Sequence, residues 1–150
     1  MHRGGERLTK DILVQYCDLR EEVKELHRRI EKLERDIQRI EDERLVTDSV
    51  TGGYGGTQHF TIRGFPFPEY SRKKTLLYSR KASLEALEYE LLKTINLAED
   101  FINSLDDARM RRLLQYRYID DLTWIQVAHK MGRRATADSV RMEINRFFDK

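Results

Sequence analysis

A heptad repeat of apolar residues in the first third of the chain constrains its fold most strongly. Apolar side chains recur from Ile12 to Ile40 at spacings that alternate between four and three residues. A repeat sustained over roughly four heptads predicts a long helix, here residues 8–44, that packs along one narrow face. β-Branched residues at position a and leucine at d favour a parallel two-stranded coil. Position a holds Tyr16, Val23, Ile30 and Ile37, and position d holds Ile12, Leu19, Leu26, Leu33 and Ile40.

A second long helix is predicted over residues 72–103, with Ser71 as its N-cap. This stretch contains neither glycine nor proline, and apolar residues recur in it every seven positions. The simplest arrangement is an antiparallel hairpin of the two helices. That arrangement competes with the parallel dimer for the same apolar face, and both hold if two hairpins meet as a four-helix bundle. The repeating residues are Leu77, Leu84, Leu91, Ala98 and Leu105, with Leu87, Thr94 and Phe101 between them.

Residues 45–70 interrupt the helical pattern. Five of the eight glycines and both prolines lie between residues 46 and 70 and exclude a continuous helix there. The segment also holds five aromatic residues, so we expect an ordered loop that folds back on the helices. Its glycine-rich run lacks the lysine of a phosphate-binding loop. His59 has no second metal-ligating residue nearby, which argues against a metal site or a catalytic site.

Composition excludes several classes of protein. Charged residues make up 36% of the chain and hydrophobic residues 39%, which suits long helices better than a deep enzyme core. The single cysteine, Cys17, allows no internal disulfide, and its outward heptad position predicts an inert surface thiol. No apolar run is long enough to span a membrane, and the first residues do not resemble a signal peptide, so we expect a cytoplasmic protein. No nucleophile–base pair, metal-ligand set or cofactor motif is present, and we expect neither an enzyme nor a cofactor.

The last third of the chain carries the positive charge and a pattern of three short helices. Residues 104–150 have a net charge of +3, against −1 for residues 1–44. Asp106 or Asp107 is predicted to cap the first helix, Thr123 the second and Thr136 the third. The second helix is expected to bury Ile125, Val127, Ala128 and Met131 and to end at Gly132 as a C′ residue. The third is expected to bury Val140, Ile144 and Phe147. Two short helices joined by a glycine-containing turn predict a helix-turn-helix.

In a helix-turn-helix the second helix, here residues 136–148, lies in the major groove of DNA. Arg141 and Asn145 lie on its outward face and are the side-chain types that bind guanine and adenine. Arg133 and Arg134 precede the helix N-terminus, where phosphate meets free N–H groups. A basic cluster that opens the second long helix is a further candidate for phosphate, although a solvated helix end is the simpler explanation. The predicted DNA-binding residues are Arg133, Arg134, Thr136, Asp138, Ser139, Arg141, Met142, Asn145, Arg146, Thr123 and Trp124, and the secondary basic cluster is Arg72, Lys73 and Lys74.

These residues resemble region four of bacterial sigma factors, in which Leu-Thr and Val/Ile-Ala precede a glycine and a later Val-Arg pair. The whole chain, including the Gly-Gly-Tyr-Gly-Gly and Gly-Phe-Pro segments, is similar to small sigma-like proteins of phages and prophages, the late transcription activators of the RinA/ArpU type. The resemblance implies DNA binding near phage promoters and contact with RNA polymerase. No region two is recognisable, so we do not expect the chain to act alone as a sigma factor. The matching residues are Leu122, Thr123, Val127, Ala128, Gly132, Val140 and Arg141.

The sequence therefore predicts an all-α protein with two domains. Residues 1–103 form a long coiled-coil-like helical hairpin that oligomerises, with the loop at 45–70, and residues 104–150 form a DNA-binding helix-turn-helix. The expected function is a sequence-specific transcriptional regulator, an activator of phage or prophage genes, that binds double-stranded DNA as a homodimer or higher oligomer in the bacterial cytoplasm. Two alternatives stay open: a DNA-packaging protein of the small-terminase kind, and a structural coiled-coil adaptor.

Overall fold

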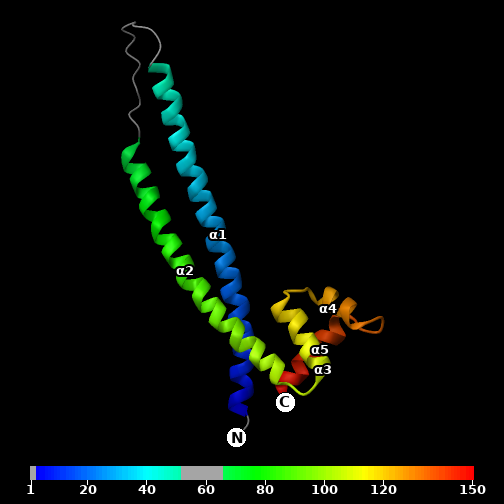
Figure 1. The fold of residues 1–150 in the computed structure, drawn as a ribbon. Coiled ribbons are helices and arrows are strands. Elements are labelled where there is room, and N and C mark those ends of the chain that lie inside the picture. The colour runs from blue at the N-terminus through cyan, green and yellow to red at the C-terminus, as the bar shows by residue number, and fades with distance from the viewer. Residues whose placement is uncertain (1–2, 52–65) are drawn as a thin grey trace. The chain divides into compact units, whose positions relative to one another are not determined.

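The computed structural model describes residues 3–51 and 66–150, with side chains for residues 10–44 and 66–150. Regular structure in these residues is entirely helical, which confirms the predicted all-α class (Figure 1). None of the helices in the described ranges combines the length and the apolar character needed to cross a bilayer. The helices are α1 (Arg3–Thr51), α2 (Phe67–Ser104), α3 (Ala108–Leu114), the π-helical turn η1 (Gln115–Ile119), α4 (Trp124–Met131) and α5 (Ala137–Asp149).

The chain forms two compact units, and α1 and α2 contribute to both. Unit 1 comprises residues 1–22 and 87–150, and unit 2 comprises residues 23–86. The units divide the chain differently from the predicted boundary at 103/104. The reason is that Leu13 of α1 and Ala98 and Ile102 of α2 are buried in the same core as the C-terminal helices.

In unit 2, α1 and α2 lie side by side and run in opposite directions (Figure 1). The predicted apolar face of α1 is buried there from Val23 to Ile40, with Ile30 and Ile37 each 5% exposed. Leu77 of α2 is buried opposite this face, whereas Leu84 is half-buried. A single chain thus covers the apolar face that the parallel dimer would also use.

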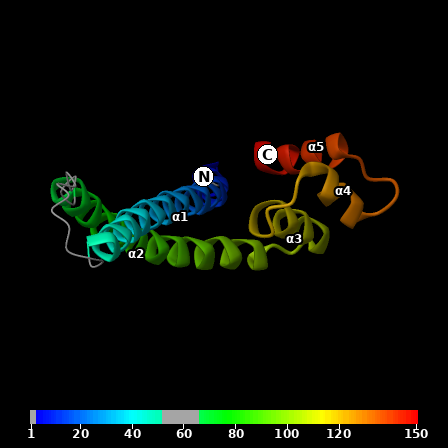
Figure 2. The ribbon, with the colours of Figure 1, turned by 90° about the horizontal axis from the view of Figure 1, so that it is seen from above.

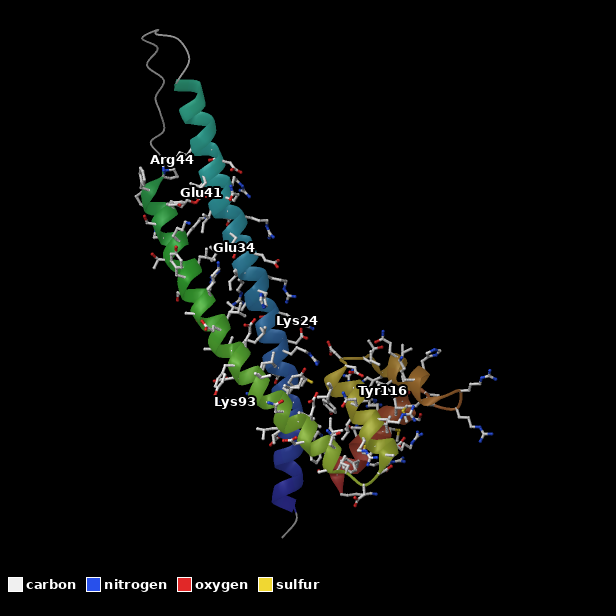
Figure 3. All side chains as sticks on the ribbon, in the orientation of Figure 1. Lys24, Glu34, Glu41, Arg44, Lys93 and Tyr116 are labelled. Carbon is white, nitrogen blue, oxygen red and sulfur yellow. The ribbon has the colours of Figure 1, made fainter. Side chains whose placement is uncertain are left out.

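Ion pairs across unit 2 match the antiparallel direction. Asp36 and Glu41, further along α1, meet Lys73 and Lys74 near the start of α2, at 3.3 and 3.6 Å. Glu34, earlier in α1, meets Lys81, later in α2, at 3.3 Å. Glu34 and Glu41 can be followed along α1 in Figure 3. The Tyr70 hydroxyl also donates to Glu41 at 2.8 Å. These pairs are partly exposed, so each stabilises little, on the order of 0–1 kcal/mol, but together they disfavour other registers.

Unit 1 has a continuous apolar core built from five helices. Figure 2 shows α3, α4 and α5 gathered into one group within it. The core draws from every one of these segments as well as from α1 and α2, and its members are at most 5% exposed. They are Leu13, Ala98, Ile102, Met110, Leu113, Leu114, Val127, Ala128, Val140 and Ile144. Leu13 lies outside the predicted heptad positions and is buried because α1 is packed on more than one side here, while Ile12 is only half-buried.

Both long helices extend beyond their predicted ends. α1 continues to Thr51, through residues 45–51 that were predicted as loop, because the first helix breaker is Gly52. α2 begins at Phe67 rather than after Ser71, with the amide of Tyr70 donating to the carbonyl of Pro66 at 2.9 Å. Pro68 is accommodated because the N–H groups of a first helical turn have no partner within the helix. The predicted aromatic loop is therefore wrong for Phe67 and Tyr70, which lie in α2, and Phe67 is 56% exposed. The rest of that loop, residues 52–65 with His59, lies outside the described ranges.

We predict that Ile30→Asp destabilises the protein by on the order of 3 kcal/mol, because it places an unpaired carboxylate at a buried position. Lys32→Asp, at an exposed position on the same helix, is the matched control and should change stability far less. Urea unfolding followed by circular dichroism measures both. Equal losses of stability in the two variants would contradict the packing described for unit 2.

Candidate nucleic-acid interface

The segment from Thr123 to Asp149 consists of two helices whose starts are fixed by the same device. Thr123 caps α4: its hydroxyl accepts from the amide of Gln126 at 3.2 Å, and the Gln126 side chain accepts from the amide of Thr123 at 2.9 Å. Thr136 caps α5 in the same reciprocal way with Ser139, at 3.0 and 2.9 Å. Both are capping boxes, which confirms the predicted N-caps.

The turn between α4 and α5 depends on Gly132, which ends α4 as predicted. Its φ of 124° and ψ of 176° do not correspond to the left-handed helical geometry of an ordinary C′ glycine. They lie in a region that essentially only glycine adopts. No atom lies within 4 Å of the place where a Cβ would be, so the backbone angle rather than crowding requires glycine here.

The core fixes which face of α5 meets solvent. Val140 and Ile144 are at most 1% exposed, and Phe147 packs partly against the same core, as predicted. The guanidinium of Arg109 on α3 donates to both carboxylate oxygens of Glu143 at 2.8 and 3.1 Å, and this pairing raises the pKa of Arg109. This tie from α3 to α5 was not predicted, because nothing in the sequence relates positions 34 residues apart.

The opposite face of α5 carries most of the residues that were predicted to lie in the major groove of DNA. At about 100° per residue, Asp138, Arg141, Met142 and Asn145 lie within about 100° of one another and away from Val140 and Ile144. All four are exposed, and Met142 is 44% exposed although it is a large apolar residue. Arg146 is exposed beside them, and the guanidinium of Arg141 lies 3.4 Å from the carboxylate of Asp138.

Basic side chains flank the start of α5. Arg133 and Arg134 are exposed, and neither makes an ion pair with another described residue; the same holds for Arg146. An open groove of about 430 Å³ adjoins the turn, lined by Arg109, Met131, Gly132, Arg133, Arg134, Ala135, Ser139 and Glu143. The capping box uses the side chains and the amides of Thr136 and Ser139. The amides of Ala137 and Asp138, in the first turn of α5, have no partner within the helix and can bind an anion.

The prediction for the buried face of α4 was wrong at one residue. Ile125 is 74% exposed, and the buried side belongs to Trp124, Val127, Ala128 and Met131, at i, i+3, i+4 and i+7. Ile125 points about 110° away from the centre of that face. Trp124, predicted to contact DNA, is half-buried against the core, and the guanidinium of Arg117 lies over its ring at 4.1 Å. The Thr123 hydroxyl, also predicted to contact DNA, already accepts a hydrogen bond in the capping box of α4.

The secondary basic cluster in unit 2 is largely paired within the hairpin. Lys73 meets Asp36 and Glu69, and Lys74 meets Glu41 and lies over the ring of Tyr70 at 5.4 Å. Arg72 is exposed and its Nε donates to the carbonyl of Pro68 at 3.3 Å. Contact of this cluster with phosphate stays a prediction, with two of its three charges already facing carboxylates.

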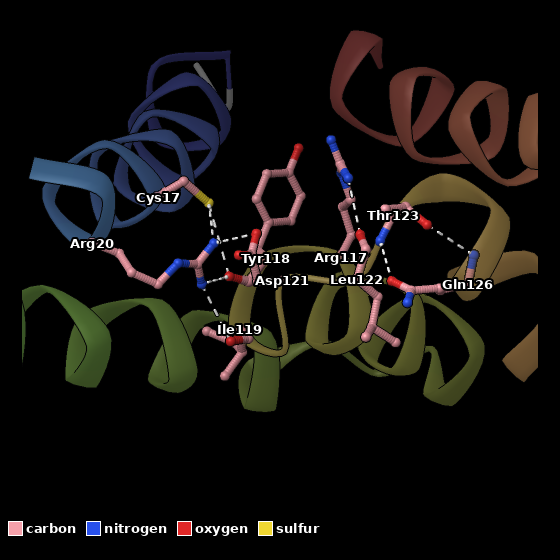
Figure 4. A network of polar contacts seen from close by, with 9 residues as sticks. All are labelled: Cys17, Arg20, Arg117, Tyr118, Ile119, Asp121, Leu122, Thr123 and Gln126. Carbon is pink, nitrogen blue, oxygen red and sulfur yellow. Dashed lines mark hydrogen bonds and ion pairs between the residues drawn. The ribbon is translucent and has the colours of Figure 1, made fainter. Parts of the chain in front are cut away.

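Arg20 of α1 connects the long helix to η1 in unit 1 (Figure 4). One terminal nitrogen donates to the carbonyls of Tyr118 and Ile119 at 2.9 and 3.3 Å, and the other lies 2.8 Å from Asp121. Carbonyls at the end of a helical segment have no partner within it and carry partial negative charge. The guanidinium of Arg20 supplies hydrogen-bond donors and a positive charge to these carbonyls, and the Arg20 side chain is only 14% exposed. The sequence gives no signal for this role, because Arg20 looks like one of many charged residues flanking the apolar face.

Cys17 lies next to this contact instead of facing open solvent, which corrects the predicted surface position. Its thiol donates to the carbonyl of Tyr118, with Sγ and O 3.8 Å apart. Burial raises the pKa of the thiol, and the nearby Arg20 charge only partly opposes this. Because the thiolate is the reactive form, the surroundings disfavour reaction at neutral pH.

No family model matches this chain, and neither the curated proteins nor the solved structures contain a match to it.

We predict that Thr136→Ala costs about 1 kcal/mol of stability, because it removes the acceptor that caps α5. Thr136→Ser keeps a hydroxyl at the same place and should lose much less. Urea unfolding of the two variants and the parent protein measures the difference. A loss for Thr136→Ser as large as that for Thr136→Ala would show that the hydroxyl is not what stabilises the helix start.

We predict that Cys17 reacts with iodoacetamide at a higher pH in the folded protein than in the protein unfolded in urea. The folded-state pKa is raised, so this group favours folding below the unfolded pKa, and that contribution is lost as the pH rises above it. Alkylation rates measured by mass spectrometry across neutral and alkaline pH give both midpoints. A folded midpoint equal to or below the unfolded one would contradict the buried environment.

Proposed function

We propose that this protein is a sequence-specific regulator of transcription that binds double-stranded DNA through α4 and α5 as a helix-turn-helix. The observation that carries the proposal is the division of α5 into two faces. One face is buried in the core through Val140 and Ile144. The other face exposes Arg141, Met142 and Asn145. A helix presented in this way can enter the major groove and bring bidentate donors to base edges.

The charges around α5 support contact with the DNA backbone. Arg133, Arg134 and Arg146 are exposed and make no ion pair with described residues, so they are available to phosphate. Phosphate contacts position a protein on the duplex and make binding depend on salt, whereas base contacts give specificity. The proposal therefore assigns these three arginines to the backbone and Arg141 and Asn145 to the bases.

The resemblance to region four of sigma factors agrees with how the matching residues pack. Val127, Ala128 and Val140 are buried, Thr123 is an N-cap, and Gly132 adopts a glycine-specific conformation. Those matches describe a packing pattern, and Arg141 is the matching residue on the exposed face of α5. On this basis the proposal extends to phage or prophage promoters as targets and to RNA polymerase as a second partner, with activation and repression both open.

Association of copies is retained in the proposal, but not through the apolar face of α1. That face is covered by α2 within one chain of unit 2, so a parallel dimer through it would have to open the hairpin. Copies would instead meet through outer surfaces, where Leu76 and Tyr78 of α2 are 41% and 67% exposed. A dimer would present two reading helices to two half-sites.

The test is selection of duplexes from a random DNA library, followed by affinity measurements on the selected duplex and a scrambled one at fixed salt. We predict that Arg141→Ala weakens binding to the selected duplex by about 1–3 kcal/mol and leaves the scrambled duplex much less affected. Arg28→Ala, which removes an exposed arginine from unit 2, is the matched control.

The outcomes separate the alternatives. An equal loss on both duplexes would assign Arg141 to phosphate, and a parent protein that binds no duplex even at low salt would overturn the proposal in favour of an adaptor. The mass of the protein in solution discriminates further, because a ring of many subunits supports a packaging protein and a dimer supports a regulator.

A further inference from the structure

Asp138 is an acidic residue on the face of α5 that is otherwise suited to bind DNA. Its side chain is 85% exposed, and it lies in the first turn of the helix, close to Arg133 and Arg134 in sequence. A carboxylate at this place repels phosphate and weakens binding to any duplex. Its negative charge near a helix N-terminus is favourable for the helix itself, but Thr136 and Ser139 already cap that end. Helix stability alone is therefore a weak reason for the acid.

The carboxylate also has a defined neighbour. Asp138 Oδ1 lies 3.4 Å from a terminal nitrogen of Arg141, one turn further along the same face. The Arg141 side chain is 48% exposed, so the pair stands in solvent and is not part of the core. The contact draws the guanidinium toward the start of the helix and leaves its remaining N–H donors and the second carboxylate oxygen available.

The two side chains have opposite hydrogen-bonding character. An ionised carboxylate only accepts hydrogen bonds, and a guanidinium only donates them. In the major groove, guanine offers two acceptors that arginine matches, and the amino group of cytosine offers a donor that an acid matches. Asp138 and Arg141 together can therefore bind the amino donor of a cytosine and the two acceptors of a guanine at neighbouring base pairs.

We propose that Asp138 is a specificity-determining residue that selects a cytosine beside the guanine read by Arg141. This rests on the proposed function and names the base that one more side chain of the same surface recognises. The carboxylate accepts from the cytosine amino group when that base is present, and at any other base it faces an unmatched edge near phosphates. Asp138 thus lowers affinity for unrelated DNA more than for the target.

The experiment compares the duplexes selected from a random library by the parent protein, by Asp138→Asn and by Asp149→Asn. Asp149 lies on the same side of the helix but about 16 Å further along, past Asn145, so its substitution makes the same change of charge at a distance from Asp138 and Arg141. The parent consensus should contain a cytosine next to a guanine. An asparagine side chain pairs with adenine in the major groove, so Asp138→Asn should replace that cytosine by adenine and leave the other positions unchanged.

Affinity measurements give the second readout. On the parent consensus, discrimination between the cytosine duplex and its adenine-substituted version should fall on the order of tenfold or reverse in Asp138→Asn. Asp149→Asn should keep the parent preference. Circular dichroism melting of each variant shows that the compared proteins are folded.

Failure of this inference differs from failure of the proposed function. If the parent protein selects a consensus and Asp138→Asn selects the same one, Asp138 reads no base and the inference is overturned while the function stands. A uniform rise in affinity for every duplex in Asp138→Asn has the same meaning, because it shows repulsion alone. If the parent protein selects no consensus, this inference and the proposed function are both overturned.

Discussion

The burial of Val140 and Ile144 in the core of unit 1 is the constraint on which the exposed surface of α5 depends. A helix turns by about 100° per residue, so fixing these two side chains fixes the direction of every other residue on the helix. The core that holds them includes residues from α1, α2, α3 and α4. The orientation of Arg141 and Asn145 is therefore determined by apolar packing that involves segments far away in sequence.

Apolar burial and surface charge contribute differently to the two units. Each buried leucine or isoleucine contributes about 1.5–3 kcal/mol of hydrophobic stabilisation, whereas a partly exposed pair such as Lys81 with Glu34 contributes at most about 1 kcal/mol. The charges of unit 2 are more important for selecting an arrangement. Asp36 and Glu41 meet lysines near the start of α2, and the earlier Glu34 meets Lys81 further along it, which fits an antiparallel hairpin.

Sequence patterns predicted the features that depend on local periodicity and on capping. The apolar face of α1 and the caps at Asp107, Thr123 and Thr136 are present as predicted. Features set by tertiary contact were missed, since Leu13 is buried only where a third element packs on α1, and the carbonyls bound by Arg20 come from residues 98 and 99 positions later. The π-helical turn at 115–119 has no recognised sequence signal. Ile125 was placed on the buried face of α4 in the position that Trp124, one residue earlier, occupies.

The geometry around Arg20 has a consequence for how this chain can change in evolution. Its forked end serves two carbonyls with one nitrogen and a carboxylate with the other, and a lysine has a single tip that cannot reach both sites. Exchange of arginine for lysine would therefore not be conservative at this position. Positions 20 and 121 are expected to vary jointly among related chains, and that covariation would be visible in an alignment without any measurement on the protein.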